Sequence, residues 1–204
     1  MALILATLAP VPSAAQWVDL IGKNLDQWHT VGDGLWTLMR DGTLLGQRVP
    51  GKAQNQSWLY TKEEFGEFDL HLEWWTRLRG NSGVSIRDTS RARYAAPAEY
   101  DRNRTPSHIG YEIQISNGYD DSYPSGSIYL FAAAKTGFQI DNDWNAFDIE
   151  SRNELIRVKL NGHLVAEHPG DPQRSKTGPI GLQLHDPGSL VMFRNIRIRA
   201  IRQK

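Results

Sequence analysis

The sequence predicts an all-β protein built as a sandwich of two antiparallel sheets. From Trp17 onward apolar and polar residues alternate with a period of two, in short runs broken by Gly, Pro, Asn and Asp. This alternation is typical of strands with one buried face. Asp41-Gly42 and Asn161-Gly162 each separate two such runs, which predicts two tight β-hairpins. About ten strands in one domain favour a sandwich.

The expected strands can be placed along the chain by their alternation and by the turn residues between them. They are 36–38 paired with 43–45, then 68–78, 83–87, 110–116, 127–131, 146–150, 156–160 paired with 163–165, 180–185 and 190–201. Asn81-Ser82-Gly83 is interpreted as a turn into its strand, with Gly83 needed for the backbone shape. The alternation slips near Arg194-Asn195, as it does at a β-bulge.

Segment 88–107 is rich in Arg, Tyr, Pro and Ala and shows no alternation. It lies between two well-defined strands, and we expect a long, partly ordered loop. No internal repeat and no shift in composition marks a second domain, so residues 16–204 are expected to form one domain.

The first fifteen residues form a short apolar run closed by Ser13-Ala14-Ala15. Small residues at these positions are typical of a signal-peptidase site, so residues 1–15 are interpreted as a secretory signal and the protein as periplasmic or secreted. The alternative is a docked strand. No later apolar stretch is long enough to span a bilayer.

Composition excludes several classes of function. The 204 residues include 23 Lys and Arg against 23 Asp and Glu, a net charge of zero, which argues against nucleic acid as a partner. The chain has no Cys, so disulfides, thiol nucleophiles and Cys-ligated metals are excluded, and any metal must be held by His, carboxylate or amide groups. The G-x-S-x-G nucleophile elbow and a phosphate-binding glycine loop are also missing.

Side chains alternate across a strand, so four of the expected strands each have one apolar and one polar face. The polar faces are rich in Gln, His, Trp, Glu and Arg, which form directed hydrogen bonds or stack on sugars. If these strands are neighbours, they form a concave polar surface that holds Glu73, Arg87, Glu112, Gln114, Gln183 and His185. The alternative is that these faces simply meet water, as one face of an antiparallel sheet often does.

The order and spacing of ten short motifs resemble the 3-keto-disaccharide hydrolase family over nearly the whole chain after residue 15. The motifs are IGKNLDQW (21–28), the hairpin after Trp36, FGEFDLHLEW (65–74), NSGVSIR (81–87), GYEIQI (110–115), GSIY (126–129), DWN (143–145), LNG (160–162), GLQLH (181–185) and FRNIRIR (193–199). The resemblance implies a concanavalin A-like jelly roll with a concave face for carbohydrate. It also implies cleavage of glycosides that carry a ketone at sugar carbon 3, in a family with related lyases and hydratases, some of which depend on a divalent metal.

A ketone at carbon 3 acidifies the hydrogen on carbon 2, so a base can remove it and the group on carbon 1 can leave by elimination, after which water adds. We expect Glu112 or His185 as the base, Arg87 or a metal at the developing oxyanion, and Glu73 as acid or metal ligand. The expected substrate-binding residues are His71, Asn81, Gln114, Tyr129, Lys135, Trp144 and Gln183. The expected ligand is an oxidised (3-keto) disaccharide or glycoside.

Several alternatives stay open. His71, Glu73, Glu112 and His185 can be combined into a divalent metal site, although their spacing matches no short metal motif. Glu73 and Arg87 can instead form a structural ion pair. A laminarinase-type glycosidase is disfavoured because neither 147–150 nor 111–114 completes its E-x-D-x-E pattern. The main alternative function is a non-catalytic, lectin-like glycan-binding module.

Overall fold

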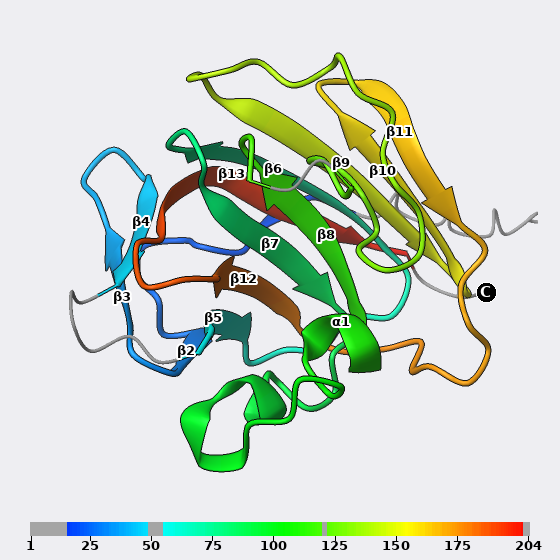
Figure 1. Ribbon diagram of the computed structural model, residues 1–204, viewed down its shortest axis with the longest axis horizontal. Coiled ribbons are helices and arrows are strands. Elements are labelled where there is room, and N and C mark those ends of the chain that lie inside the picture. The colour runs from blue at the N-terminus through cyan, green and yellow to red at the C-terminus, as the bar shows by residue number, and fades with distance from the viewer. Residues whose placement is uncertain (1–15, 49–54, 120–121, 202–204) are drawn as a thin grey trace, which may run out of the picture.

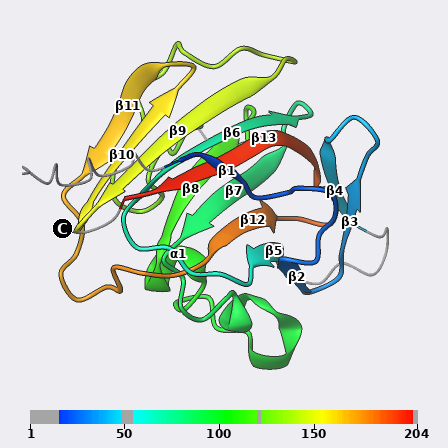
Figure 2. The ribbon, with the colours of Figure 1, turned by 180° about the vertical axis from the view of Figure 1, so that it is seen from behind.

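The computed structural model describes residues 16–48, 55–119 and 122–201, and this part of the chain holds thirteen strands in two sheets. The predicted secretory segment 1–15 lies outside the described residues. The two sheets pack face to face, as the views from the front and from behind show (Figure 1, Figure 2). The predicted all-β sandwich of two antiparallel sheets is confirmed.

The larger sheet has eight strands and the smaller has five, and all their pairings are antiparallel. The order in the larger sheet is β11 (His163–His168), β10 (Leu155–Leu160), β9 (Asn145–Arg152), β6 (Phe68–Thr76), β13 (Leu190–Ala200), β4 (Leu44–Arg48) and β3 (Gly34–Leu38), with β1 (Val18–Asp19) paired to β13. The order in the smaller sheet is β2 (Trp28–Val31), β5 (Ser57–Thr61), β12 (Ile180–Leu184), β7 (Asn81–Ile86) and β8 (Tyr111–Ser116).

The core lies between the sheets and is formed by the apolar faces that the alternation predicts. Leu70, Leu72 and Trp74 face inward from β6 and are almost fully buried. Ile113 and Leu182 meet them from the smaller sheet. Burying such side chains contributes about 1.5–3 kcal/mol each, which is the main force that holds the two sheets together.

The predicted local features are mostly present. Gly42, and Asn161 with Gly162, have positive φ in the two hairpin turns, as a tight turn between twisted strands requires. The bulge is also confirmed, because the register of β13 against β6 shifts between Arg194 and Arg197.

Two local predictions are wrong. Residues 127–131 do not form a strand: Ile128 makes isolated bridges, and the chain then turns back at once, because the Phe131 and Ala132 N–H groups donate to the Ile128 carbonyl. Asn81-Ser82-Gly83 is not a turn but the first half of β7.

The outer faces of the two sheets differ in burial. Along β6, β9 and β10, buried residues alternate with partly exposed ones, so the outer face of the larger sheet meets water. Every residue of β5, β7, β8 and β12 is buried. The polar outer face of the smaller sheet is therefore covered by other parts of the chain.

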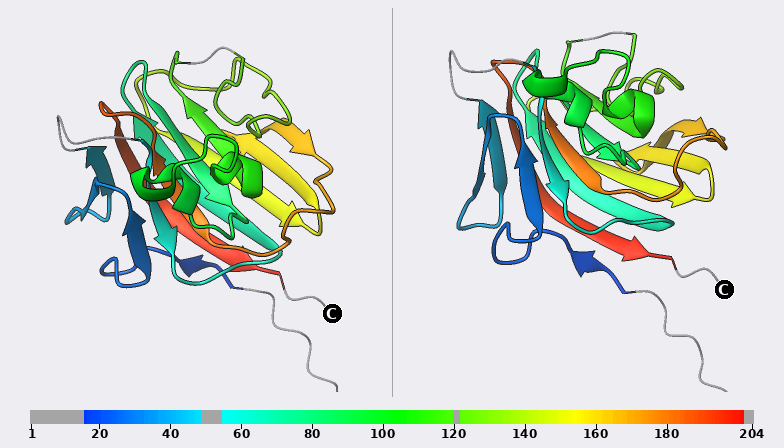
Figure 3. Two further views of the ribbon diagram at one scale, coloured as in Figure 1. Left: turned by 60° about the horizontal axis from the view of Figure 1, so that its bottom comes forward. Right: turned by 90° about the horizontal axis from the view of Figure 1, so that it is seen from below.

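The cover is formed in part by segment 88–107, which stands on the outward face of the smaller sheet (Figure 3). We call this segment the lobe. It contains the 3-10 turns η1 (Arg93–Ala95) and η2 (Pro97–Glu99) and leads into the short helix α1 (Pro106–Ile109). The expected partly ordered loop is thus a folded element, which lacks alternation because it contains no strand.

The lobe is fixed to the smaller sheet by a small apolar cluster and one buried carboxylate. Ala92 and Ala95 pack against Trp58 and Tyr60, whose rings stack with centroids 5.7 Å apart. Asp88, fully buried, accepts hydrogen bonds from the Tyr60 hydroxyl at 2.8 Å and from the Ala92 N–H at 2.7 Å. Burial, above all, and the charge of Asp88 raise the pKa of Tyr60 well above its ordinary value, so the phenol stays a donor.

Replacing Tyr60 with Phe removes one donor from the buried Asp88 and should destabilise the protein by about 1–3 kcal/mol. The measurement is denaturant unfolding of Tyr60→Phe beside Tyr94→Phe, a control in the same lobe whose hydroxyl has no hydrogen bond among the described residues. Equal stability of the two variants would show that the Tyr60 hydroxyl does not anchor the lobe.

Candidate active site

A cavity of about 310 Å³ lies between the lobe and the outer face of the smaller sheet. Asn81 from β7 and Glu112 and Gln114 from β8 line it, together with His185, which directly follows β12. The remaining lining residues come from the lobe, from α1 and from three loops, and they are Gln56, Tyr100, Arg102, Thr105, Ser107, His108, Tyr119 and Tyr129.

Two glycines make room for larger side chains on this face of the sheet. A Cβ atom on Gly83 would lie 2.7 Å from Glu112 Oε1, so the carboxyl group rests directly on the backbone of β7. A Cβ atom on Gly181 would lie 2.4 Å from the Tyr60 ring. Gly83 is therefore needed for the close approach of a side chain and not for an unusual turn.

Glu112 is a buried carboxyl group that favours its protonated form. Its side chain is only 5% exposed, and burial raises its pKa to about 8, opposed in part by the Gln183 amide. The two atoms of that amide are themselves buried without a hydrogen bond of normal geometry among the described residues. At neutral pH Glu112 is thus mostly a neutral acid with a proton to donate.

The two histidines of the cavity favour their neutral form. Burial lowers the pKa of His185, with Asp186 acting to raise it and Arg48 to lower it further. Burial also lowers the pKa of His108, which contacts the Thr105 hydroxyl through Nδ1 at 2.9 Å. A neutral imidazole has a nitrogen lone pair, so the cavity combines a carboxylic acid with groups that can accept a proton.

Amide and aromatic side chains complete the cavity. Asn81 and Gln114, both nearly buried, provide donors and acceptors that suit the hydroxyl groups of a sugar. Tyr119 packs edge-on against His185 with ring centroids 5.7 Å apart, and Tyr129 packs in the same way against Tyr123 at 4.9 Å. The cavity is thus polar at its floor and aromatic at its side, as expected of a small-molecule site.

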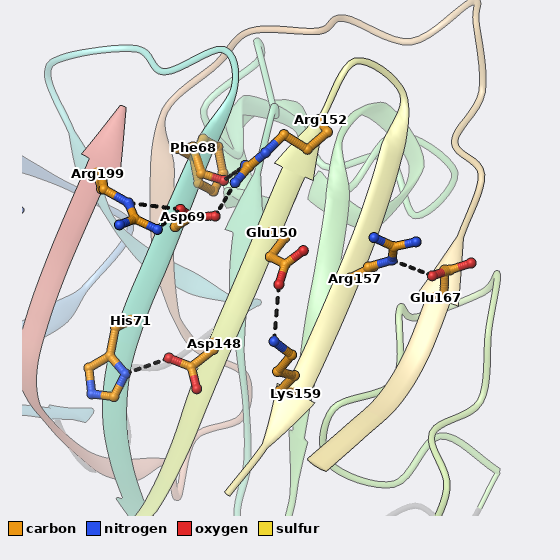
Figure 4. A network of polar contacts seen from close by, with 10 residues as sticks. All are labelled: Phe68, Asp69, His71, Asp148, Glu150, Arg152, Arg157, Lys159, Glu167 and Arg199. Atoms are coloured by element: carbon orange, nitrogen blue, oxygen red, sulfur yellow. Dashed lines mark hydrogen bonds and ion pairs between the residues drawn. The ribbon is translucent and has the colours of Figure 1, made fainter. Parts of the chain in front are cut away.

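The structure separates two of the expected residues, His71 and Glu73, from this cavity. The prediction that Glu73 shares a surface with Glu112 is wrong because β6 belongs to the larger sheet, whose outer face lies on the opposite side of the sandwich. Figure 4 shows that face, where His71 Nδ1 lies 2.7 Å from Asp148 Oδ1. Glu73 pairs with Arg194, with Arg194 Nε 2.6 Å from Glu73 Oε2. For these residues the alternative that the polar face meets water is correct, whereas the alternative ion pair of Glu73 with Arg87 is wrong.

Arg87 is also outside the cavity. The residue has a φ of 59°, directly after β7, which turns its side chain out of the alternation of the strand. The guanidinium is buried and donates to the Ser151 hydroxyl at 2.6 Å and to the Asn153 carbonyl. Arg87 therefore bridges the two sheets, and its expected place at an oxyanion, beside Glu112, is wrong.

Three expected substrate-binding residues lie elsewhere. Gln183 is in the expected face but lies fully buried beneath the cavity, where it affects Glu112. Lys135 lines a second cavity of about 310 Å³ at the rim of the sandwich. Trp144 lies under the guanidinium of Arg194, 4.0 Å from its ring centre, beside the outer face of the larger sheet.

The residues expected to hold a metal do not form one site. His71 and Glu73 lie on the opposite side of the sandwich from Glu112 and His185. Among the described residues, moreover, no three His, Asp or Glu side chains are grouped closely enough to hold an ion. The donor set does not fit the metal that the resemblance implied.

Seven of the lining residues were missed from the sequence. Tyr100, Arg102, Thr105 and Ser107 come from a segment without periodicity, His108 comes from α1, which follows it, and Gln56 and Tyr119 come from loops. The available signal was the length of the insertion between two neighbouring strands, since a long segment at a strand end commonly covers a site.

The chain belongs to the 3-keto-disaccharide hydrolase family. The family's model, described as a 3-keto-alpha-glucoside-1,2-lyase-like domain, matches residues 16–199. No curated protein matches the chain significantly.

Several solved structures share the fold of this chain. A candidate glycosyl hydrolase from Parabacteroides distasonis is 26% identical, with a TM-score of 0.71 over 91% of this chain and 100% of that one. A β-glucanase from Bacillus licheniformis is 13% identical, with a TM-score of 0.59 over 94% and 100% of the two chains. The carbohydrate-binding module CBM66 from Bacillus subtilis is 16% identical, with a TM-score of 0.54 over 85% and 96%. None of the helices in the described part of the chain is long and apolar enough to cross a membrane.

The raised pKa of Glu112 has a consequence for stability. The pKa of Glu112 is about 8 in the folded protein, against 4.5 as its ordinary value. The contribution of this carboxyl to the stability of the fold is therefore complete below pH 4.5 and is lost as the pH rises toward 8. Between pH 4.5 and 8 the stability of Glu112→Gln relative to the wild type should therefore rise by a few kcal/mol, at most about 5, at about 1.4 kcal/mol per pKa unit.

Chemical denaturation across this pH range measures the difference, and Glu73→Gln is the matched control. Burial acts to raise the pKa of Glu73, but hydrogen bonds from Asn195 and Arg194 and the arginine charge outweigh it and lower the pKa. That variant should accordingly show no rise in relative stability with pH. A Glu112→Gln difference that does not change with pH would mean that Glu112 is not buried as described.

Proposed function

We propose that the protein cleaves 3-keto-glycosides by elimination and hydration, with His185 as the base and Glu112 as the acid. The single observation that carries the proposal is that the buried Glu112 carboxyl lines one covered cavity together with the imidazoles of His185 and His108, where burial favours the neutral form of each group. Membership of the family and the similarity to a candidate glycosyl hydrolase support a carbohydrate substrate.

In the first half-reaction His185 removes the proton from carbon 2, which the neighbouring ketone acidifies. The electron pair then forms the double bond between carbons 1 and 2 while the bond from carbon 1 to the glycosidic oxygen breaks. Glu112 gives its proton to that oxygen, so the alcohol leaves in neutral form. In this proposal the amide groups of Asn81 and Gln114, which line the same cavity, donate to the enolate oxygen that develops at carbon 3.

The second half-reaction reverses these roles. The Glu112 carboxylate takes a proton from water, whose oxygen bonds to carbon 1, and the His185 imidazolium returns its proton to carbon 2. The net reaction consumes one water and releases a 3-keto sugar and an alcohol, and both side chains regain their starting protonation.

Conventional acid–base hydrolysis is less well supported. That chemistry uses two carboxyl groups that flank the scissile bond, one as acid and one as base or nucleophile. Among the described residues that line the cavity, Glu112 is the one carboxyl group. The elimination route needs a single carboxyl group and a base, which matches this set.

The test is release of alcohol from 4-nitrophenyl 3-keto-glucosides of both anomers, beside the unoxidised glucosides, as a function of pH. We expect turnover of the 3-keto substrate alone. Activity should fall below a pKa under 6.5 as His185 gains a proton and above about pH 8 as Glu112 loses one. Turnover of the plain glucoside would overturn the mechanism, and saturable sugar binding with no turnover of either would identify a lectin-like module instead.

The variant Glu112→Gln separates the acid from the base. It should lower kcat by about 10²–10⁴-fold on a 3-keto-disaccharide, whose sugar leaving group needs a proton. In the first turnover, which precedes the hydration step that also uses Glu112, release should slow much less on the 4-nitrophenyl substrate, whose leaving group departs as an anion, and the alkaline limb should disappear. Glu73→Gln, on the opposite face, should keep full activity, and equal losses of Glu112→Gln in the first turnover of both substrates would contradict the role as acid.

A further inference from the structure

We propose that Arg102 binds a carboxylate on the leaving group, so that the preferred substrates are glycosides of acidic aglycones. The inference rests on the proposed function only for the identity of the reaction. Arg102 lines the cavity from the lobe, whereas Glu112 and His185 line it from the sheet, so a bound glycoside would meet them with different parts of its structure.

The other arginines of the lobe have partners. Arg91 pairs with Glu64 at 3.0 Å, Arg93 pairs with Glu99 at 2.8 Å, and Arg104 stacks over the Tyr94 ring at 3.5 Å from its centre. Arg102 has no ion pair, hydrogen bond or ring contact among the described residues. Of these four cations it is also the one that lines the cavity.

The rest of the cavity offers Arg102 no counter-charge. Glu112 is its one lining carboxyl group, and it is mostly protonated at neutral pH. Two further arginines, Arg48 near His185 and Arg174 near His108, already have a carboxylate partner. Arg48 pairs with Asp33 at 2.6 Å, and Arg174 pairs with Asp171 at 3.7 Å. Asp101, next along the chain, accepts from the Asn103 N–H and does not line the cavity.

A cavity with one unpaired cation favours a ligand with one negative charge. The planar guanidinium matches the two oxygens of a carboxylate, and this bidentate contact is stronger than a neutral hydrogen bond. A phosphate offers more acceptor oxygens than a single arginine can satisfy. An acidic sugar derivative as the leaving unit therefore fits the position and the charge of Arg102.

The test compares ligands that differ only in this charge, and it needs no turnover. Calorimetric titration at pH 7 gives the Kd of maltobionate against maltitol and of cellobionate against cellobiitol, so that both anomers are covered. The aldonates should bind about tenfold more tightly than the alditols, less so at 0.5 M NaCl because salt screens an exposed charge. Arg102→Gln should abolish the preference, and Arg104→Gln, in the same lobe but away from the cavity, should keep it.

Equal affinities within both pairs, an unchanged preference in Arg102→Gln, or no binding of any of the four compounds would overturn the inference. Its failure can be told from failure of the proposed function. Turnover of a neutral 3-keto-disaccharide without any aldonate preference would leave the reaction in place and remove the role of Arg102. An Arg102-dependent preference without turnover of 3-keto substrates would keep the role of Arg102 and remove the proposed reaction.

Discussion

The docking of the lobe on Trp58 and Tyr60 is the contact on which the candidate site depends. Without this cover, the polar face of β7, β8 and β12 would be an ordinary solvated face like that of β6. With it, a carboxyl group that would be ionised in water becomes a neutral acid, because burial penalises its charged form. The Asp88 carboxylate holds the start of the lobe at the end of β7, next to the sheet that carries Glu112.

The small residues of the same face are as important as the large ones. Gly83 lets the Glu112 carboxyl lie against the backbone, and Gly181 does the same for the Tyr60 ring. Both would be ordinary strand positions if judged by φ, since neither is among the residues with positive φ. Because these two positions have no side chain, a neighbouring side chain can lie flat against the backbone of the strand.

Sequence alone predicted the strands and their faces well and the site only in part. Alternation correctly assigned Glu112, Gln114 and His185 to a polar face, but it cannot tell to which sheet a strand belongs, so Glu73 and His71 were added to the wrong side. Arg87 was assigned to the wrong face because its own positive φ turns its side chain out of the alternation of β7. Arg102 from the lobe and His108 from α1 reach the cavity through tertiary contacts that follow no sequence period, and pattern analysis does not detect such contacts.

The most direct test of this account is the titration of the Glu112 carboxyl itself. Carbon-13 NMR of protein labelled at the glutamate carboxyl carbon follows each group with pH, and the resonance missing from Glu112→Gln identifies Glu112. The account predicts a midpoint near 8. A midpoint near the ordinary value of 4.5 would mean that the carboxyl is solvated, that the lobe does not close over the smaller sheet, and that Glu112 is not the acid.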